Sequence, residues 1–176
     1  MLNKTFNEQD YKLKLLQENI ETIVYSLACF LVPFFLGHPQ FLVGTMVNCA
    51  LILGAFNVRK YRLLPIIIAP SLGVFARGII FGQMTVFLLY MIPFIWIGNL
   101  VIVYLFKHYK DNKFKGLLAG PLAKAGFLFI VAFALFSFGL VPKIFLFAMG
   151  VMQLATALSG GVIAVGLQKA KKRFNL

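Results

Sequence analysis

A small set of polar side chains interrupts the long apolar stretches of this sequence, and the set contains no acid. Its members lie either well inside those stretches, at Asn48, Asn99, Gln153 and Thr156, or near their ends, at His38, Gln40, Arg77 and Gln83. Together they offer hydrogen-bond donors and acceptors, one permanent cation and no carboxylate. This chemistry suits the binding of a neutral or anionic polar molecule better than the binding of a cation.

Each of these groups also has a structural interpretation. An Asn, Gln or Thr inside a helical membrane protein commonly forms an interhelical hydrogen bond, worth about 0.6–2 kcal/mol. Taken singly, each residue fits that role. Taken together, the mid-depth amides and the polar residues at the ends fit one cavity reached from outside. We therefore predict that the set binds a solute.

Catalysis finds little support in the sequence. After Glu21 the only acidic residue is Asp111, and no serine has an identifiable base. Cys29 and Cys49 form no CxxC motif, and no Walker A sequence occurs. We predict a protein that is not an enzyme and holds no cofactor or metal ion. If its function uses ATP, we expect another chain to hydrolyse it.

The elements that must position these residues are apolar stretches of a length that suits membrane crossing. A helix needs about 20 apolar residues to span a hydrocarbon core of about 30 Å. The stretches are Ile20–Leu36, Phe41–Phe56, Leu63–Phe81, Thr85–Phe106, Leu117–Leu140 and Ile144–Leu167. The sequence predicts an all-α integral membrane bundle of six transmembrane helices spanning residues 20–168.

The positive charges give this bundle an orientation. Nearly all of the 17 Lys and Arg residues lie before the first stretch or after the second, fourth and sixth. Arg77 and Lys143 lie at the opposite side, and Lys124 lies inside the fifth stretch. Since cationic loops stay in the cytoplasm, we predict a multi-pass cell-membrane protein with both termini cytoplasmic, including a basic tail over residues 169–176.

The overall composition excludes two other classes of protein. Hydrophobic residues make up 61% of the chain and charged residues 12%, with a mean hydropathy of +0.90. A soluble globule needs more polar surface than that. The net charge of +12 lies in short loops beside the membrane, where anionic lipid headgroups attract it. We therefore predict the lipid bilayer as a partner and no nucleic acid.

Three segments carry more specific expectations. The capping-box pattern at Thr5–Glu8 and helical apolar spacing predict a short cytoplasmic amphipathic helix within residues 1–19. Several Pro and Gly residues predict a third segment, Leu63–Phe81, that is broken and packs inside the bundle or lines a cavity. For Lys124 two accounts compete. In the one we favour, Gly116–Lys124 forms an interfacial turn or helix, broken at Pro121, and the span starts near Ala125. In the other, the Lys124 side chain reaches the cytoplasmic headgroups.

Small residues spaced four apart recur along the apolar stretches. Such pairs let helix backbones approach closely. The pairs near the start of the fifth stretch are Gly116 with Gly120 and Ala119 with Ala123. They fit packing within the chain, and they also fit a docking surface for another membrane subunit.

Three runs carry a resemblance to a known group of proteins: Gly37–Gly44, Met91–Asn99 and Gln153–Ala157. With six spans in under 200 residues, the chain resembles a group of small bacterial six-span membrane proteins. In size and layout that group is similar to the substrate-binding S components of energy-coupling factor vitamin transporters. The resemblance implies a subunit that captures a vitamin or similar micronutrient from outside and docks on a transmembrane coupling subunit with ATPases. The Ala-x-x-x-Ala docking motif of that family has no counterpart in the first span, which contains Ala28 alone.

Two functions remain open from the sequence. The first is a membrane subunit that binds or passes a small polar solute of the vitamin or micronutrient class, without its own ATPase. The second is a structural or assembly subunit of a larger membrane complex, with no solute of its own. The mid-depth amides separate them, because a solute cavity and a purely structural bundle use those amides differently.

Overall fold

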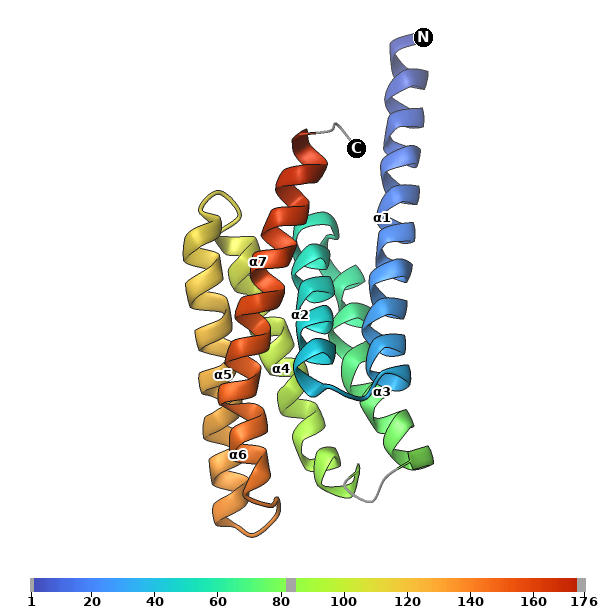
Figure 1. Cartoon of the computed structure of the whole chain (residues 1–176). Coiled ribbons are helices and arrows are strands. Elements are labelled where there is room, and N and C mark those ends of the chain that lie inside the picture. Colours follow the sequence, from blue (N-terminus) through green and yellow to red (C-terminus); the bar gives the residue numbers. More distant parts are fainter. Residues whose placement is uncertain (1, 82–84, 174–176) are drawn as a thin grey trace.

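Helices form the whole ordered framework in the computed structural model, which describes residues 2–81 and 85–173 (Figure 1). Within those ranges the chain has no strand. The helices are α1 Leu2–Phe35, α2 Gln40–Asn57, α3 Leu64–Phe81, α4 Thr85–His108, α5 Lys113–Ser137, α6 Ile144–Met149 and α7 Val151–Arg173, with one 3-10 turn, η1, at Lys60–Leu63. The predicted all-α class is confirmed.

Five helical segments are long and apolar enough to cross a membrane. They are Tyr11–Phe35, Gln40–Asn57, Phe87–His108, Lys113–Ser137 and Ile144–Lys171. Large apolar side chains also face outward from the bundle: Leu100 is 51% exposed, Ile130 68% and Val151 62%. Hydrocarbon, unlike water, accommodates such a surface on every side. The protein is a multi-pass helical membrane protein.

The basic segments gather at one end of the bundle. The first turns of α1, the last turns of α7 and the connections α2–η1 and α4–α5 all lie at that end (Figure 1). The α1–α2 and α5–α6 connections lie at the other end. We call these the basic end and the opposite end. This arrangement agrees with the charge pattern of the sequence, in which every second connection is basic.

Glycines bring the helices close together. A Cβ at Gly73 of α3 would collide with the backbone carbonyl of Phe30 in α1. A Cβ at Gly160 of α7 would lie 2.6 Å from the carbonyl oxygen of Thr45 in α2, and one at Gly44 of α2 would lie 2.8 Å from Thr156 Cγ2. None of these three contacts leaves room for a side chain. The α1–α3 and α2–α7 pairs are therefore packed backbone against backbone, as expected where lipid supplies no hydrophobic drive.

The predicted short N-terminal helix is not a separate element. Helix α1 runs without interruption from Leu2 to Phe35, so the Thr5–Glu8 pattern lies inside a helix and not at the start of one. Its first half extends past the other helices at the basic end (Figure 1). The sequence loses its apolar character on the N-terminal side of Ile20, and the backbone remains helical across that point.

The predicted break in the third segment was also wrong, because α3 continues through Pro70. A proline removes a backbone donor and disturbs the preceding turn. Here two side chains bond the carbonyls of that turn: Ser71 Oγ donates to Ile68 O at 2.9 Å, and Asn99 Nδ2 of α4 donates to Ile67 O at 2.9 Å. The carbonyl that loses its donor to Pro70 is Ile66 O, and the two side-chain bonds hold the neighbouring turn of the helix.

A real interruption occurs in the sixth segment instead. Helices α6 and α7 meet at Gly150, whose φ of −97° and ψ of −94° are not helical. A Cβ there would lie 2.8 Å from Phe129 Cδ2 of α5. The glycine therefore lets α5 approach the point where the helix is interrupted. Met149 and Met152, on either side of it, line the cavity described below.

Candidate solute-binding site

A buried hydrogen-bonded cluster joins three helices in the middle of the bundle. Lys124 Nζ of α5 donates to Asn48 Oδ1 of α2 at 2.7 Å. Asn48 Nδ2 donates in turn to Thr156 Oγ1 of α7 at 3.2 Å and to Gly44 O at 2.9 Å. The three side chains are each at most 3% exposed. We call this group the Lys124 cluster.

The α2–α7 crossing sets the positions of Asn48 and Thr156. Gly44 faces Thr156, and Gly160 lies against the next turn of α2, where a Cβ would meet Asn48 Cβ at 2.9 Å. With the two backbones this close, an amide on α2 reaches a hydroxyl on α7 directly. Thr156 Oγ1 donates to Met152 O at 2.8 Å and so accepts from Asn48. Both side chains are fully engaged by the fold.

Neither account of Lys124 made from the sequence was correct. Helix α5 is continuous from Lys113 through Pro121 to Ser137, so the predicted break before Ala125 does not occur. The Lys124 side chain is 3% exposed and points to Asn48 inside the bundle, away from any headgroup region. The structure thus places a lysine in the protein interior, where an ionisable group is expensive to bury and usually serves a function.

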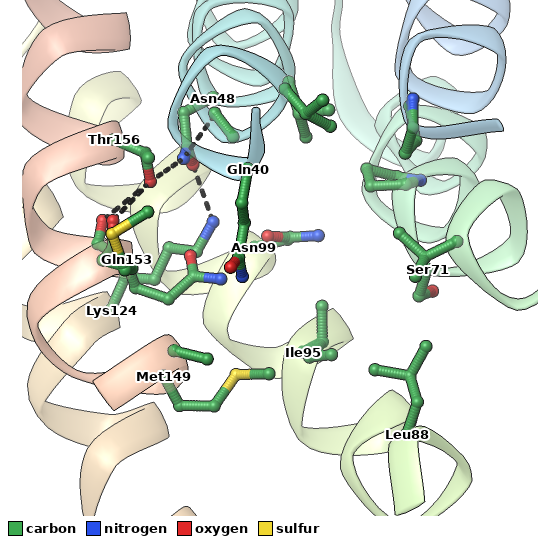
Figure 2. A pocket seen from close by; sticks show the side chains of 18 residues that line it. Gln40, Asn48, Ser71, Leu88, Ile95, Asn99, Lys124, Met149, Gln153 and Thr156 are labelled. Atoms are coloured by element: carbon green, nitrogen blue, oxygen red, sulfur yellow. Dashed lines mark hydrogen bonds between the residues drawn. The ribbon is translucent and has the colours of Figure 1, made fainter. Parts of the chain in front are cut away.

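A cavity of about 180 Å³ opens beside the Lys124 cluster (Figure 2). Every helix from α1 to α7 contributes to its wall. The polar side chains on that wall are Gln40, Asn48, Ser71, Asn99, Lys124, Gln153 and Thr156, and the remainder are apolar or glycine. A mostly apolar cavity with a few convergent polar groups is the usual form of a small-molecule site.

Three of these polar side chains have bonding capacity that the fold does not use. Within the described chain, the side-chain amide of Gln153 forms no hydrogen bond, and Asn99 uses only its Nδ2 group. Lys124 uses one of its three N–H donors. Figure 2 shows the three side chains directed into the same space. The cavity therefore offers both donors and acceptors to a bound molecule, with one amine and no carboxylate.

The structure brings together most of the predicted binding residues. Gln40, Asn48, Asn99, Gln153 and Thr156 all line the cavity. Gln40 is exposed, at the first turn of α2, so the cavity wall extends toward the opposite end of the bundle. The sequence missed Lys124 and Ser71 as members. Lys124 carried a readable signal, since an intramembrane cation is a candidate functional group on its own.

The other predicted binding residues lie elsewhere. His38 is exposed in the α1–α2 connection and is not part of the cavity wall. Arg77 Nη1 donates to the carbonyls of Phe34 at 2.8 Å and Phe35 at 3.1 Å, at the C-terminal end of α1. The arginine therefore stabilises a helix terminus. Gln83 lies outside the described residues.

The predicted docking residues divide into inner and outer positions. Gly116 and Gly120 are buried, and a Cβ at Gly120 would lie 2.9 Å from Phe106 Cε2 of α4. These glycines serve the α4–α5 contact. Ala123 is exposed and Ala119 is partly exposed. The outer face of α5 thus keeps only part of the predicted set.

Charged side chains pair at the basic end. Glu18 bonds Arg59 Nε at 2.6 Å and Arg62 Nη1 at 2.9 Å, and Glu21 bonds Lys171 Nζ at 2.9 Å. A second cavity of about 370 Å³ adjoins the Glu18 group. Among the described residues, no three His, Cys, Asp or Glu side chains are placed to hold a metal ion. Glu18 and Glu21 are therefore both used in ion pairs at this end.

Comparison with known proteins adds no further constraint. No protein-family model, no curated protein and no solved structure matches this chain. The class that the fold itself defines is a multi-pass helical membrane protein with a polar cavity among its helices.

Proposed function

We propose that the protein is an integral membrane subunit that binds a small polar solute in the cavity beside the Lys124 cluster. In this proposal the chain crosses the membrane six times, with both termini and the basic end in the cytoplasm. The solute enters from the opposite end, past Gln40. Energy for any transport comes from a coupling subunit with ATPases, because the chain has no nucleotide-binding motif of its own.

One observation carries this proposal: the cavity contains polar groups that the fold leaves unused. A bundle that needed its amides only for cohesion would pair them with one another, as Asn48 and Thr156 are paired. Gln153 and Asn99 instead direct unused groups into the cavity, together with Lys124. Unused polar groups at this depth are costly unless a polar ligand or water meets them.

The size of the cavity limits the solute. An apolar cavity of about 150 Å³ holds one benzene molecule. By the same scale, the 180 Å³ space holds a solute of roughly six to ten non-hydrogen atoms. This range fits the smaller micronutrients, and larger ones would have to extend toward the opposite end.

A cavity-filling variant tests the proposal. Ala148 of α6 lines the cavity, and Ala148→Leu places an isobutyl group inside it. The purified full-length protein is unfolded by heat in detergent with a library of small polar metabolites. A ligand at about 100 times its Kd stabilises the wild type by about 2.7 kcal/mol. We expect Ala148→Leu to remove that stabilisation.

Ala134→Leu is the matched control, because Ala134 lies on the outer face of α5 and is exposed. It makes the same chemical change without entering the cavity, and it should keep the wild-type response. Small molecules released from the two purified variants are identified in parallel by mass spectrometry. A set of bound solutes that is the same in Ala148→Leu and Ala134→Leu would refute a site in this cavity.

A further inference from the structure

Lys124 is a buried amine that forms no ion pair within the described chain. No acidic side chain lines the cavity. Glu18 and Glu21 are bonded to Arg59, Arg62 and Lys171 at the basic end, and Asp111 is exposed in the α4–α5 connection. A buried charge normally requires an opposite charge beside it. In its ammonium form Lys124 therefore needs an opposite charge from outside this set of residues.

The geometry holds the amine in place at the cavity wall. Asn48 cannot rotate to another partner, because its Nδ2 group is bonded to Gly44 O and Thr156 Oγ1. Its Oδ1 atom is thereby fixed toward Lys124 Nζ at 2.7 Å. Asn48 and Thr156 are positioning residues for the amine. Two of the three N–H donors of Lys124 remain for a molecule in the cavity.

We infer that the solute carries one carboxylate and that Lys124 binds it. This inference rests on the proposed function, and it names the class of solute. An N⁺–H···O⁻ hydrogen bond is about twice as strong as a neutral one, so the carboxylate is the natural acceptor for the unused donors. The side-chain amide of Gln153 lies on the same wall and supplies an N–H donor for the second carboxylate oxygen.

Charge balance favours a monocarboxylate over a phosphate. Lys124 is the only Lys or Arg side chain among the residues that line the cavity. A phosphate with about two negative charges would bring a second charge that has no partner there. One carboxylate neutralises one ammonium group, and the amides and apolar residues then contact the uncharged remainder of the solute.

Matched pairs of acids and amides test this inference. Each pair has nearly the same shape and differs in charge: acetate and acetamide, propionate and propionamide, benzoate and benzamide. Their Kd values for the full-length protein in detergent are measured at constant ionic strength. We expect at least one carboxylate to bind about tenfold or more tightly than its amide. Lys124→Met should abolish this preference.

Two further variants control the experiment. Lys124→Gln keeps an N–H donor for Asn48, so loss of preference in both Lys124 variants reports the charge and not a collapsed cluster. Lys143→Met removes an exposed lysine at the opposite end and should keep the preference. Equal affinity of the wild type for all acids and amides, or a preference that survives in Lys124→Met, would overturn the inference.

These experiments distinguish a failure of the carboxylate inference from a failure of the proposed function. Amides that bind the wild type and not Ala148→Leu would leave the solute cavity standing while the carboxylate assignment falls. A carboxylate preference that is lost in Lys124→Met and is unchanged in Ala148→Leu would support the anion site and remove the cavity as the place where the solute lies.

Discussion

The α2–α7 crossing should fail when its smallest residue is enlarged, and the structure gives the size of the effect. In Gly160→Ala the new Cβ would lie 2.6 Å from Thr45 O, 2.8 Å from Cys49 N and 2.9 Å from Asn48 Cβ. Two of these atoms are backbone, so relief requires the two helices to separate. Overpacking costs about 1–3 kcal/mol, and backbone contacts place this site at the upper end, near 3 kcal/mol.

The higher helix propensity of alanine partly offsets this cost of overpacking. Alanine favours a helix over glycine by about 1 kcal/mol. The net loss for Gly160→Ala is then about 2 kcal/mol, which corresponds to a decrease in Tm of about 4–8 °C for a protein of this size. Gly166 lies on the same helix and is exposed, and a Cβ added to it would meet no other atom within 4 Å. Gly166→Ala should therefore raise the stability by about 1 kcal/mol.

Thermal unfolding of both variants in the same detergent measures the difference, which we expect to be about 3 kcal/mol. The helix-propensity gain is the same in the two variants and cancels. Because the displaced backbone carries Asn48, Gly160→Ala should also weaken carboxylate binding at Lys124. A Tm for Gly160→Ala equal to that of Gly166→Ala would refute the close backbone packing of α2 and α7.

Two other predictions concern the ends of the bundle. Arg77→Gln removes a charged donor from the carbonyls of Phe34 and Phe35 and should lower the stability by about 2 kcal/mol. Calorimetric titration should show that the solute affinity is unchanged. A loss of affinity without a loss of Tm would contradict this structural role of Arg77. Reporters fused at both termini and in the Asn57–Arg62 connection should all report cytoplasm, and an external signal from either terminus would contradict the orientation.

The positions of the helices were readable from the sequence because hydropathy and length are local properties. The predicted stretches Phe41–Phe56 and Thr85–Phe106 match α2 and α4 to within a few residues. The start of α1 was not readable in the same way. Hydropathy reports where a helix leaves the apolar phase, and α1 continues beyond that point as a helix.

The direction in which each side chain faces was harder to predict. In a soluble protein an apolar stripe marks the inner face of a helix. In lipid both faces are apolar, so the sequence of α2 does not show which side of it meets α7. The amides Asn48, Asn99 and Gln153 all line one cavity in the structure, because polar groups among apolar helices avoid hydrocarbon and turn inward.

Lys124 shows the limit of that rule. The cost of burying a cation favoured an interfacial position when only neighbours in sequence were considered. The group that accepts its hydrogen bond is Asn48, which lies on another helix and is itself fixed by Thr156. That arrangement depends on three helices packing at once. No local pattern around Pro121 carries this information.

The bonding within the Lys124 cluster bears on the choice between a solute subunit and an assembly subunit. An assembly subunit needs cohesion inside and small residues outside, yet Gly44, Gly120 and Gly160 are used for contacts within the chain. The Lys124–Asn48 bond adds cohesion between α5 and α2, but a neutral side-chain donor would supply such a bond without the cost of burying an ionisable amine. The amine is therefore best explained by something that binds it, and the cavity beside it has room for a small carboxylate.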